Sequence, residues 1–378
     1  MKIGIVCYPT FGGSGVVATE LGKGLAKKGH EVHFITYSQP TRLDFFNENL
    51  FYHEVAIRSY PLFKYPPYEL ALASKMVDVA KFEKLDVLHV HYAIPHASAA
   101  VVAKQILKAE GIDIPVVTTL HGTDITLVGK DPSYEPVVTF SINQSDIVTS
   151  VSEDLRKDTF KHFNVLRDIQ VIPNFVDLDK FKRQRKDHFK TAICPNGEKL
   201  VVHISNFRKV KRVDDVVRIF KNVLDTVPSK LLLVGDGPER SMIESLCREL
   251  GIYESVRFLG KLEAIEEVLS VADLFLMPSE KESFGLAALE AMACEVPVIS
   301  SNAGGIPELN IDGLTGFTSD IGNIEEMTKN ALHILSEDNL ETFKANALIK
   351  AKEFNIENIL PMYEHAYETA IAGVLAVS

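Results

Sequence analysis

The sequence predicts an α/β protein of two parallel-sheet domains, and three observations support this prediction. The chain has 378 residues, which exceeds the size at which a single hydrophobic core usually stops growing. Short apolar runs alternate with segments of helical periodicity along most of its length. This alternation is interrupted once, near residues 173–177, and then begins again. We therefore expect one domain at 1–174 and a second at 175–355, followed by a helical segment from about 356 to 378.

The expected strands form two series. The first series covers residues 2–7, 31–36, 86–91, 115–120, 147–150 and 169–172, with helical patterns between them, for example at 15–28 and 69–83. The second series covers 199–204, 230–234, 256–258, 273–277 and 296–300. Strands that alternate with helices in this way form parallel sheets, and such sheets bind ligands at the carboxyl ends of their strands. Candidate functional residues are therefore expected directly after the strands.

Composition narrows the classes of partner. Lys and Arg total 40 against 51 Asp and Glu, so the formal net charge is −11. An acidic surface argues against nucleic-acid binding, which needs a basic face. The N-terminus runs straight into a strand pattern without a secretory signal, and no apolar run is long enough to span a membrane. The four cysteines form no Cys-x-x-Cys pattern, which fits a reduced compartment. We expect a cytoplasmic protein without membrane or nucleic-acid partners, and a homo-oligomer is left open.

The most informative stretch lies between Glu282 and Glu290. An apolar strand pattern ends at Pro278, and the residues between the two glutamates are mostly apolar and helix-forming. This places Glu282 in the loop after a strand and Glu290 about two turns into the next helix. The first N–H groups of a helix attract a phosphate, and carboxylates accept hydrogen bonds from hydroxyl groups. The spacing therefore suits a nucleotide-sugar, although an ordinary amphipathic helix with a glutamate at each end has the same pattern.

A cationic loop follows the first strand of the second series. It contains four basic residues, namely Arg208, Lys209, Lys211 and Arg212. In so acidic a chain this cluster indicates a clamp for a diphosphate, with a solvated basic loop as the alternative. The next strand ends at Gly235 and Gly237, whose lack of side chains favours either a close approach to a ligand or a tight turn.

In the first half, a glycine-rich loop follows the first strand. Gly13, Gly15 and Ala18 formally match the dinucleotide-binding fingerprint. That fingerprint predicts an acidic residue at the end of the second strand, but the segment 34–38 has none. NAD binding is therefore disfavoured, although the loop still allows a phosphate to approach the backbone.

Histidines close the next strands. His89, His91 and His96 raise the possibility of a metal site, but no cysteine or carboxylate near them in sequence completes one. We instead expect Tyr92 and its neighbours to line the ligand cleft. His121 follows another strand, where it is either a polar group near the sugar of a nucleotide-sugar or a loop histidine bonded to backbone.

A second potential metal motif is Asp177-Leu178-Asp179, because two aspartates with this spacing can bind a metal ion together with a diphosphate. Here it lies in the expected linker after Pro173. We interpret it as turn chemistry and expect no metal or other cofactor to be required for catalysis.

The order of these features along the chain resembles that of the retaining GT-B glycosyltransferases of family 4. The resemblance covers nearly the whole chain and ends with Ala303-Gly304-Gly305-Ile306-Pro307-Glu308. It implies two Rossmann-like domains that face an interdomain cleft, with the C-terminal helix crossing back to the first domain. It also implies catalytic roles for His121, Arg208, Lys211 and Glu282. The donor contacts that it implies are Gly13, Ser14, Gly15, Asn206, Arg208, Lys211, Gly235, Glu282, Ser283, Phe284, Gly285, Leu286 and Glu290.

Within the family, segments 7–15, 89–96, 120–126 and 205–208 resemble a subgroup of bacillithiol biosynthesis that uses UDP-GlcNAc as donor and L-malate as acceptor. Malate's two carboxylates need hydrogen-bond donors, and the acceptor-binding candidates are Ser14, Lys64, Tyr92, His121 and Thr123. The resemblance further implies that the departing phosphate takes the acceptor's proton.

One departure from the family pattern concerns the cationic loop. The family usually has Gly-Arg where this chain has Ser205 and Asn206, while Lys211 keeps the lysine position. We expect Arg208 to take over the arginine's role. The alternatives are a family member with another acceptor, such as a lipid or glycan, a nucleotide-sugar epimerase of the same fold, and an inert nucleotide-sugar-binding regulator.

Overall fold

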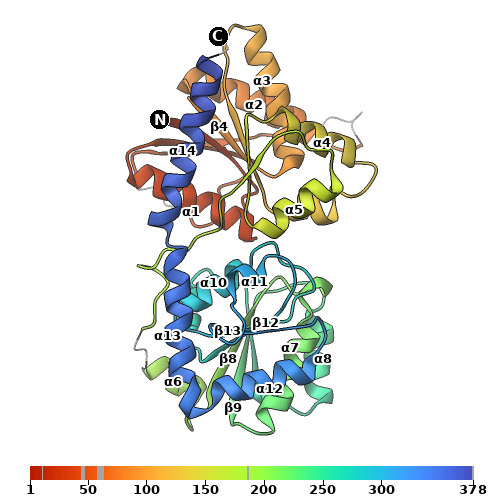
Figure 1. Ribbon diagram of the computed structural model, residues 1–378, viewed down its shortest axis with the longest axis vertical. Helices are drawn as coiled ribbons and strands as arrows, with labels where there is room; N and C mark the ends of the chain where they lie inside the picture. The colour runs from red at the N-terminus through yellow and green to blue at the C-terminus, as the bar shows by residue number, and fades with distance from the viewer. Residues whose placement is uncertain (11, 44–46, 58–63, 185–186, 377–378) are drawn as a thin grey trace. The chain divides into compact units, whose positions relative to one another are not determined.

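The chain divides into two compact units. A computed structural model describes residues 1–10, 12–43, 47–57, 64–184 and 187–376. The first unit contains residues Met1–Asn174 and Ile356–Ser378, and the second contains Phe175–Asn355. Each unit has a parallel sheet of its own with helices on both faces (Figure 1). The predicted α/β class with two parallel sheets is therefore confirmed.

The first unit has a seven-stranded sheet in the order β3-β2-β1-β4-β5-β6-β7. Its strands are β1 (Lys2–Val6), β2 (Glu31–Thr36), β3 (Leu50–Glu54), β4 (Val87–His91), β5 (Val116–Leu120), β6 (Ile147–Ser150) and β7 (Ile169–Val171). Strand β1 pairs with β2 on one side and β4 on the other, so the strand order reverses at β1. Ligands of open α/β sheets bind beside such a reversal, at the carboxyl ends of the strands.

Helices cover both faces of this sheet. They are α1 (Gly13–Lys27), α2 (Tyr68–Glu83), α3 (Ser98–Ala109), α4 (Glu135–Gln144), α5 (Glu153–His162) and α14 (Ile356–Leu375), with short turns η1 (Ala93–Ala97) and η2 (Thr123–Leu127). Helices α2 and α3 pack together on one face, around apolar residues such as Met76 and Leu88. The C-terminal α14 lies beside α1 and contacts β4 and β5 (Figure 1).

The second unit has a six-stranded sheet in the order β10-β9-β8-β11-β12-β13. Its strands are β8 (Lys199–Ile204), β9 (Ser229–Val234), β10 (Val256–Gly260), β11 (Leu274–Met277), β12 (Val298–Ser301) and β13 (Gly316–Ser319). All neighbouring strands are parallel. The strand order reverses at β8, which pairs with β9 and β11.

The helices of the second unit follow its strands. They are α6 (Asp187–Ile193), α7 (Val213–Leu224), α8 (Arg240–Glu249), α9 (Ile265–Leu269), α10 (Leu286–Ala293), α11 (Ile306–Leu309), α12 (Ile324–Leu335) and α13 (Glu337–Glu353), with turns η3 (Lys209–Lys211) and η4 (Tyr253–Ser255). Helix α7 packs against α8 and α12, and α10 packs against α9 and α13. Among the described residues of the chain, no helix combines the length and apolar character needed to cross a bilayer.

Candidate active site

In the second unit, Glu282 is fixed by the loop that follows β11. The strand itself is buried along its length. After Pro278 the chain turns, and the backbone oxygen of Glu282 accepts a hydrogen bond of 2.9 Å from the N–H of Gly305. Because Gly305 belongs to the loop after β12, two neighbouring strand ends together position this glutamate.

The side chain of Glu282 meets Lys211 from the loop after β8. The Lys211 Nζ donates to Glu282 Oε1 at 2.5 Å, and the two side chains are 21% and 14% exposed. The pairing joins residues that are far apart in sequence but follow adjacent strands, since β8 and β11 are neighbours. A partly buried cation at this position can neutralise a phosphate, while the carboxylate keeps it oriented before a ligand arrives.

His203 and Gly235 support the cationic loop through their contacts with Ser205. His203 is buried at the end of β8, where its ring nitrogens bond to the Leu276 carbonyl oxygen and the Ser205 hydroxyl, each at 2.8 Å. Burial lowers the pKa of His203 to about 4, so the ring is neutral near pH 7. A Cβ on Gly235 would lie 1.8 Å from the Ser205 carbonyl oxygen. The glycine is therefore required for the β9 loop to pack against the cationic loop.

Helix α10 offers its N-terminus immediately after Glu282. Gly285 caps the helix with φ +94°, a conformation that suits glycine. The N–H groups of Ala288 and Leu289 donate to the Gly285 carbonyl oxygen, and these are the first hydrogen bonds of the helix. The N–H of Leu286 lies before them, at the start of the helix. The Phe284 side chain is buried and packs edge-to-face on Phe354, so only its backbone can serve a ligand.

The other predicted donor residues differ in exposure. Glu290 is buried on the second turn of α10 with 6% of its surface exposed, whereas Ser283 is half-buried. Asn206 and Arg208 are both exposed. Among the described residues, Arg208 has no side-chain hydrogen bond or ion pair, so its guanidinium is available to an anion.

In the first unit, four of the five predicted acceptor residues follow β1, β4 and β5, together with the predicted donor residues Gly13 and Gly15, whereas Lys64 follows β3. Gly13, Ser14 and Gly15 open α1, and the Tyr92 hydroxyl donates to Ser14 Oγ at 2.8 Å. Thr123 is exposed and also interacts with the Tyr92 hydroxyl. Lys64 is exposed and lies 5.5 Å from the Tyr65 ring centroid.

His121 joins this group through a histidine pair. His91 Nδ1 lies 2.8 Å from His121 Nε2, and the Tyr92 and His121 ring centroids are 5.3 Å apart. We name Ser14, His91, Tyr92, His121 and Thr123 the first-unit cluster. Lys211, Glu282 and Glu290 are the second-unit cluster.

The histidines within and next to the first-unit cluster are neutral near pH 7. Burial lowers the pKa of His89 and His121 to about 3 and that of His96 to about 4, and it lowers the pKa of His91 well below its usual value. His89 bonds to the Tyr367 hydroxyl of α14 at 2.8 Å and to Thr119 at 2.7 Å. These histidines therefore act as uncharged hydrogen-bonding groups.

The comparisons with known proteins cover nearly the whole chain. A family model described as Glycosyltransferase Family 4 matches residues 11–180, and one described as Glycosyl transferases group 1 matches 184–352. A protein of Bacillus anthracis named N-acetyl-alpha-D-glucosaminyl L-malate synthase is 49% identical over 97% of this chain and 96% of its own length. The chain belongs to glycosyltransferase family 4.

More distant relatives agree with this assignment. An uncharacterized glycosyltransferase of Methanocaldococcus jannaschii is 26% identical over 98% of this chain and 99% of its own length. Among solved structures, a sucrose-phosphate synthase from Thermosynechococcus elongatus has a TM-score of 0.82 at 21% identity, covering 99% of this chain and 100% of its own. Anabaena HepE in complex with UDP and glucose also has a TM-score of 0.82, at 20% identity, covering 97% and 99%. These likenesses show that the glycosyltransferase has the GT-B fold.

Two residues of this family 4 glycosyltransferase were not singled out from its sequence. Asp124 is buried, and its carboxylate accepts from the N–H groups of Ala93 and Gly122 at 2.9 and 3.0 Å. It therefore ties the loop after β4 to the loop after β5, which carry Tyr92 and His121. His203 has the corresponding supporting role in the second unit. The sequence signal for both is a polar residue at, or a few residues after, the carboxyl end of an expected strand.

The Asp-x-Asp segment of the glycosyltransferase forms a turn. Asp177 Oδ1 accepts from the N–H of Asp179 at 2.9 Å. This is the hydrogen bond of an Asx-turn, as its place after Pro173 predicts.

Proposed function

We propose that this glycosyltransferase moves N-acetylglucosamine from UDP-GlcNAc to the hydroxyl group of L-malate with retention, giving GlcNAc-α-malate as the first step of bacillithiol biosynthesis. The observation that carries the proposal is the 49% identity to the Bacillus anthracis enzyme, which extends over nearly the full length of both chains. The two clusters support it with chemistry that suits a nucleotide diphosphate and a small polar acceptor.

In this proposal the second unit binds the donor. Lys211 and Arg208 hold the diphosphate, and Lys211 stabilises the negative charge that grows on the departing UDP. The partly buried Glu282 keeps Lys211 in place at 2.5 Å until the phosphate shares it, and it then contacts the sugar. The N–H groups at the start of α10 bind phosphate oxygens, and Glu290 accepts hydrogen bonds from the ribose hydroxyls.

The first unit binds the acceptor. The hydroxyl groups of Ser14, Tyr92 and Thr123 hydrogen bond the malate carboxylates, and His121 contributes a neutral ring nitrogen. Lys64 is the one cation among the proposed acceptor residues, and it is exposed.

Retention requires no dedicated protein base. The bond between the anomeric carbon and the phosphate oxygen breaks, a bond to the malate hydroxyl oxygen forms on the same face, and the hydroxyl proton passes to the departing phosphate. The properties of the protein groups support this route. Burial lowers the pKa of His121 to about 3, so it is a poor general base near pH 7. The Asp124 oxygens are occupied by backbone N–H groups.

We also propose that transfer needs no metal ion, because Lys211 and the α10 N-terminus neutralise the diphosphate. Turnover should persist in EDTA without added magnesium or manganese. Complete loss in EDTA that either ion reverses would contradict this part of the proposal.

The decisive experiment measures UDP release from UDP-GlcNAc with a panel of hydroxy acids and alcohols. L-Malate should stimulate release far more than D-malate or glycerol, because only the L-isomer can present its hydroxyl while both carboxylates keep their contacts. Equal rates with glycerol would overturn the assignment of L-malate as acceptor but would not affect the assignment of UDP-GlcNAc as donor. Release from another nucleotide-sugar in preference to UDP-GlcNAc would overturn the donor.

A further inference from the structure

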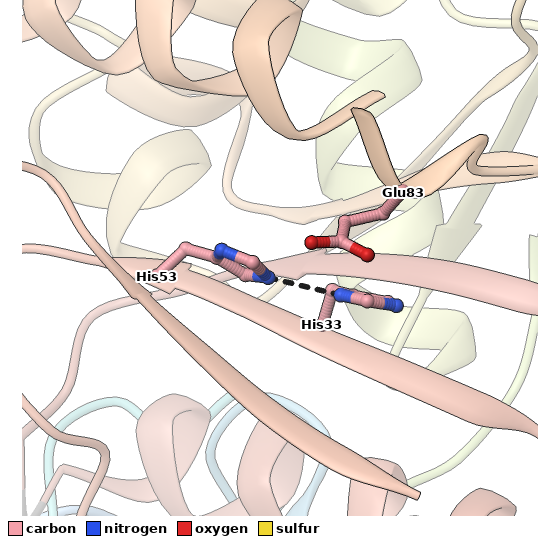
Figure 2. A group of neighbouring side chains, drawn as sticks. All are labelled: His33, His53 and Glu83. Carbon is pink, nitrogen blue, oxygen red and sulfur yellow. Dashed lines mark hydrogen bonds between the residues drawn. The ribbon is translucent and has the colours of Figure 1, made fainter. Parts of the chain in front are cut away.

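A group of potential metal ligands lies at the edge of the first unit's sheet. His33 comes from β2, His53 from the edge strand β3, and Glu83 from the last position of α2. In β2 and β3, the register pairs His33 with Phe51 and Ile35 with His53, so both histidines project from the same face. Helix α2 covers this face and brings Glu83 over it (Figure 2).

The ligand atoms of these three residues are close together. One atom from each lies within 4.8 Å of the other two, and His33 Nδ1 is 2.9 Å from His53 Nε2. Figure 2 shows the Glu83 carboxylate beside the two imidazole rings. His33 is buried, whereas His53 and Glu83 are half-buried. The group can therefore be reached from solvent at the sheet edge.

A fourth residue orients the buried histidine. His33 Nε2 lies 3.1 Å from Glu31 Oε1, and Lys2 Nζ donates to the same oxygen at 2.7 Å. The Lys2 ammonium forms an ion pair with Glu31, so Glu31 acts as a carboxylate acceptor. An ionised Glu31 accepts, so Nε2 of His33 carries the hydrogen and Nδ1 presents its lone pair to the group. Carboxylate–histidine pairs of this kind orient metal ligands in proteins.

The hydrogen bond between the two rings determines which of their nitrogens carries the hydrogen. Since Nδ1 of His33 carries a lone pair, the hydrogen between the rings belongs to Nε2 of His53. A shift of that hydrogen to Nδ1 of His53 turns both facing nitrogens into ligands.

We propose that His33, His53 and Glu83 bind a divalent transition-metal ion, and that Zn²⁺ fits this ligand set best. The bound ion holds β2, β3 and the end of α2 together. Two imidazole nitrogens and one carboxylate form a ligand set typical of zinc, with water at the fourth position, whereas calcium and magnesium prefer oxygen alone. A cation there also relieves the unfavourable placement of Glu83 at a helix C-terminus. This inference is independent of the proposed function, in which catalysis needs no metal.

The test is a Zn²⁺ titration of the metal-stripped, full-length protein in competition with a chromophoric chelator. We expect one tight site per chain, and Co²⁺ at that site should give the visible bands of a four-coordinate nitrogen and oxygen environment. Glu83→Gln and His53→Gln should each weaken Zn²⁺ binding by at least tenfold, and Glu31→Gln by roughly 10- to 100-fold. Glu110→Gln is the matched control, because Glu110 is exposed and pairs with Lys81 outside the group.

Thermal unfolding provides a second measurement that does not depend on activity. Zn²⁺ should raise the Tm of the unaltered protein and of Glu110→Gln, and should have little effect on Glu83→Gln, because only a bound ion stabilises the folded state. Turnover of Glu83→Gln should stay unchanged. Absence of a stoichiometric site, or a Zn²⁺ affinity in Glu83→Gln and His53→Gln equal to that of the unaltered protein, would overturn the proposal and leave an ordinary hydrogen bond between two histidines.

Discussion

The first-unit cluster is built from uncharged groups, whereas the second-unit cluster is built from charges. Tyr92 bonds to Ser14, and His121 bonds to His91, whose pKa burial lowers well below its usual value. Lys211 and Glu282, by contrast, form an ion pair that is still partly exposed. Both clusters occupy the same place in their sheets, beside the strand where the order reverses. The same sheet architecture therefore carries an uncharged cluster in one unit and a charged cluster in the other, depending on which side chains follow the strands.

The largest expected effect tests the charge of the second-unit cluster. Lys211→Met should lower kcat/KM for UDP release by roughly 100- to 1,000-fold, as does loss of a group that stabilises charge in a transition state. Lys209→Met is the matched control, because Lys209 is an exposed cation of the same loop that has no role in the proposed mechanism. Equal losses in the two variants would mean that the loop acts only through its overall charge.

A second change keeps the cluster and removes one negative charge. Glu290→Gln should weaken UDP binding by roughly 10- to 150-fold, because a charge-assisted hydrogen bond to a ribose hydroxyl contributes about 1.5–3 kcal/mol. Calorimetric titration with UDP measures this change, and the KM for the acceptor should move much less. An unchanged affinity for UDP would refute the ribose assignment.

The sequence predicts the positions of these residues but not all of the contacts between them. The positions of Glu282 and Glu290 were predictable, because an apolar strand, a proline and a helix-forming run are local signals. The contact between Lys211 and Glu282 was not, since it depends on β8 lying beside β11. Strand β3 was missed because it lies at a sheet edge and its residues are half-buried or exposed. Strand β13 was missed because it has only four residues, GFTS, with little apolar pattern.

The neutral histidines predict how stability depends on pH. The pKa of His89 is about 3 in the folded state against an ordinary value of 6.5. Below pH 6.5 the unfolded chain therefore takes up a proton that the folded state refuses, and the free energy of unfolding falls as the pH falls towards 3. Between pH 6.5 and pH 5 this amounts to about 2 kcal/mol for one such histidine.

His89→Gln isolates this effect. Urea unfolding at pH 7.5 and pH 5 should show a smaller drop in stability for the variant than for the unaltered protein, whatever the variant's stability at pH 7.5. His365→Gln is the control, because His365 is exposed and, among the described residues, has no ion pair. This variant should show the same drop as the unaltered protein. Identical drops in His89→Gln and the unaltered protein would show that His89 is protonated as readily in the folded state as in the unfolded one.

The smallest expected effect tests recognition by uncharged hydroxyl groups in the first-unit cluster. Tyr92→Phe removes the hydroxyl that bonds to Ser14 at 2.8 Å and keeps the ring beside His121. Loss of one such hydrogen bond costs about 0.5–1.5 kcal/mol of binding free energy, so the KM for L-malate should rise roughly 2- to 12-fold. Thr123→Ala should act in the same direction, because Thr123 also interacts with the Tyr92 hydroxyl. The affinity for UDP should stay within experimental error in both variants, since the proposed donor contacts of the second-unit cluster are untouched.

Tyr134→Phe is the matched control, because Tyr134 is exposed at the start of α4. Normal malate kinetics in both Tyr92→Phe and Thr123→Ala would remove the acceptor assignment from the first-unit cluster, whereas a parallel loss of UDP affinity would mean that the two clusters do not divide recognition between acceptor and donor.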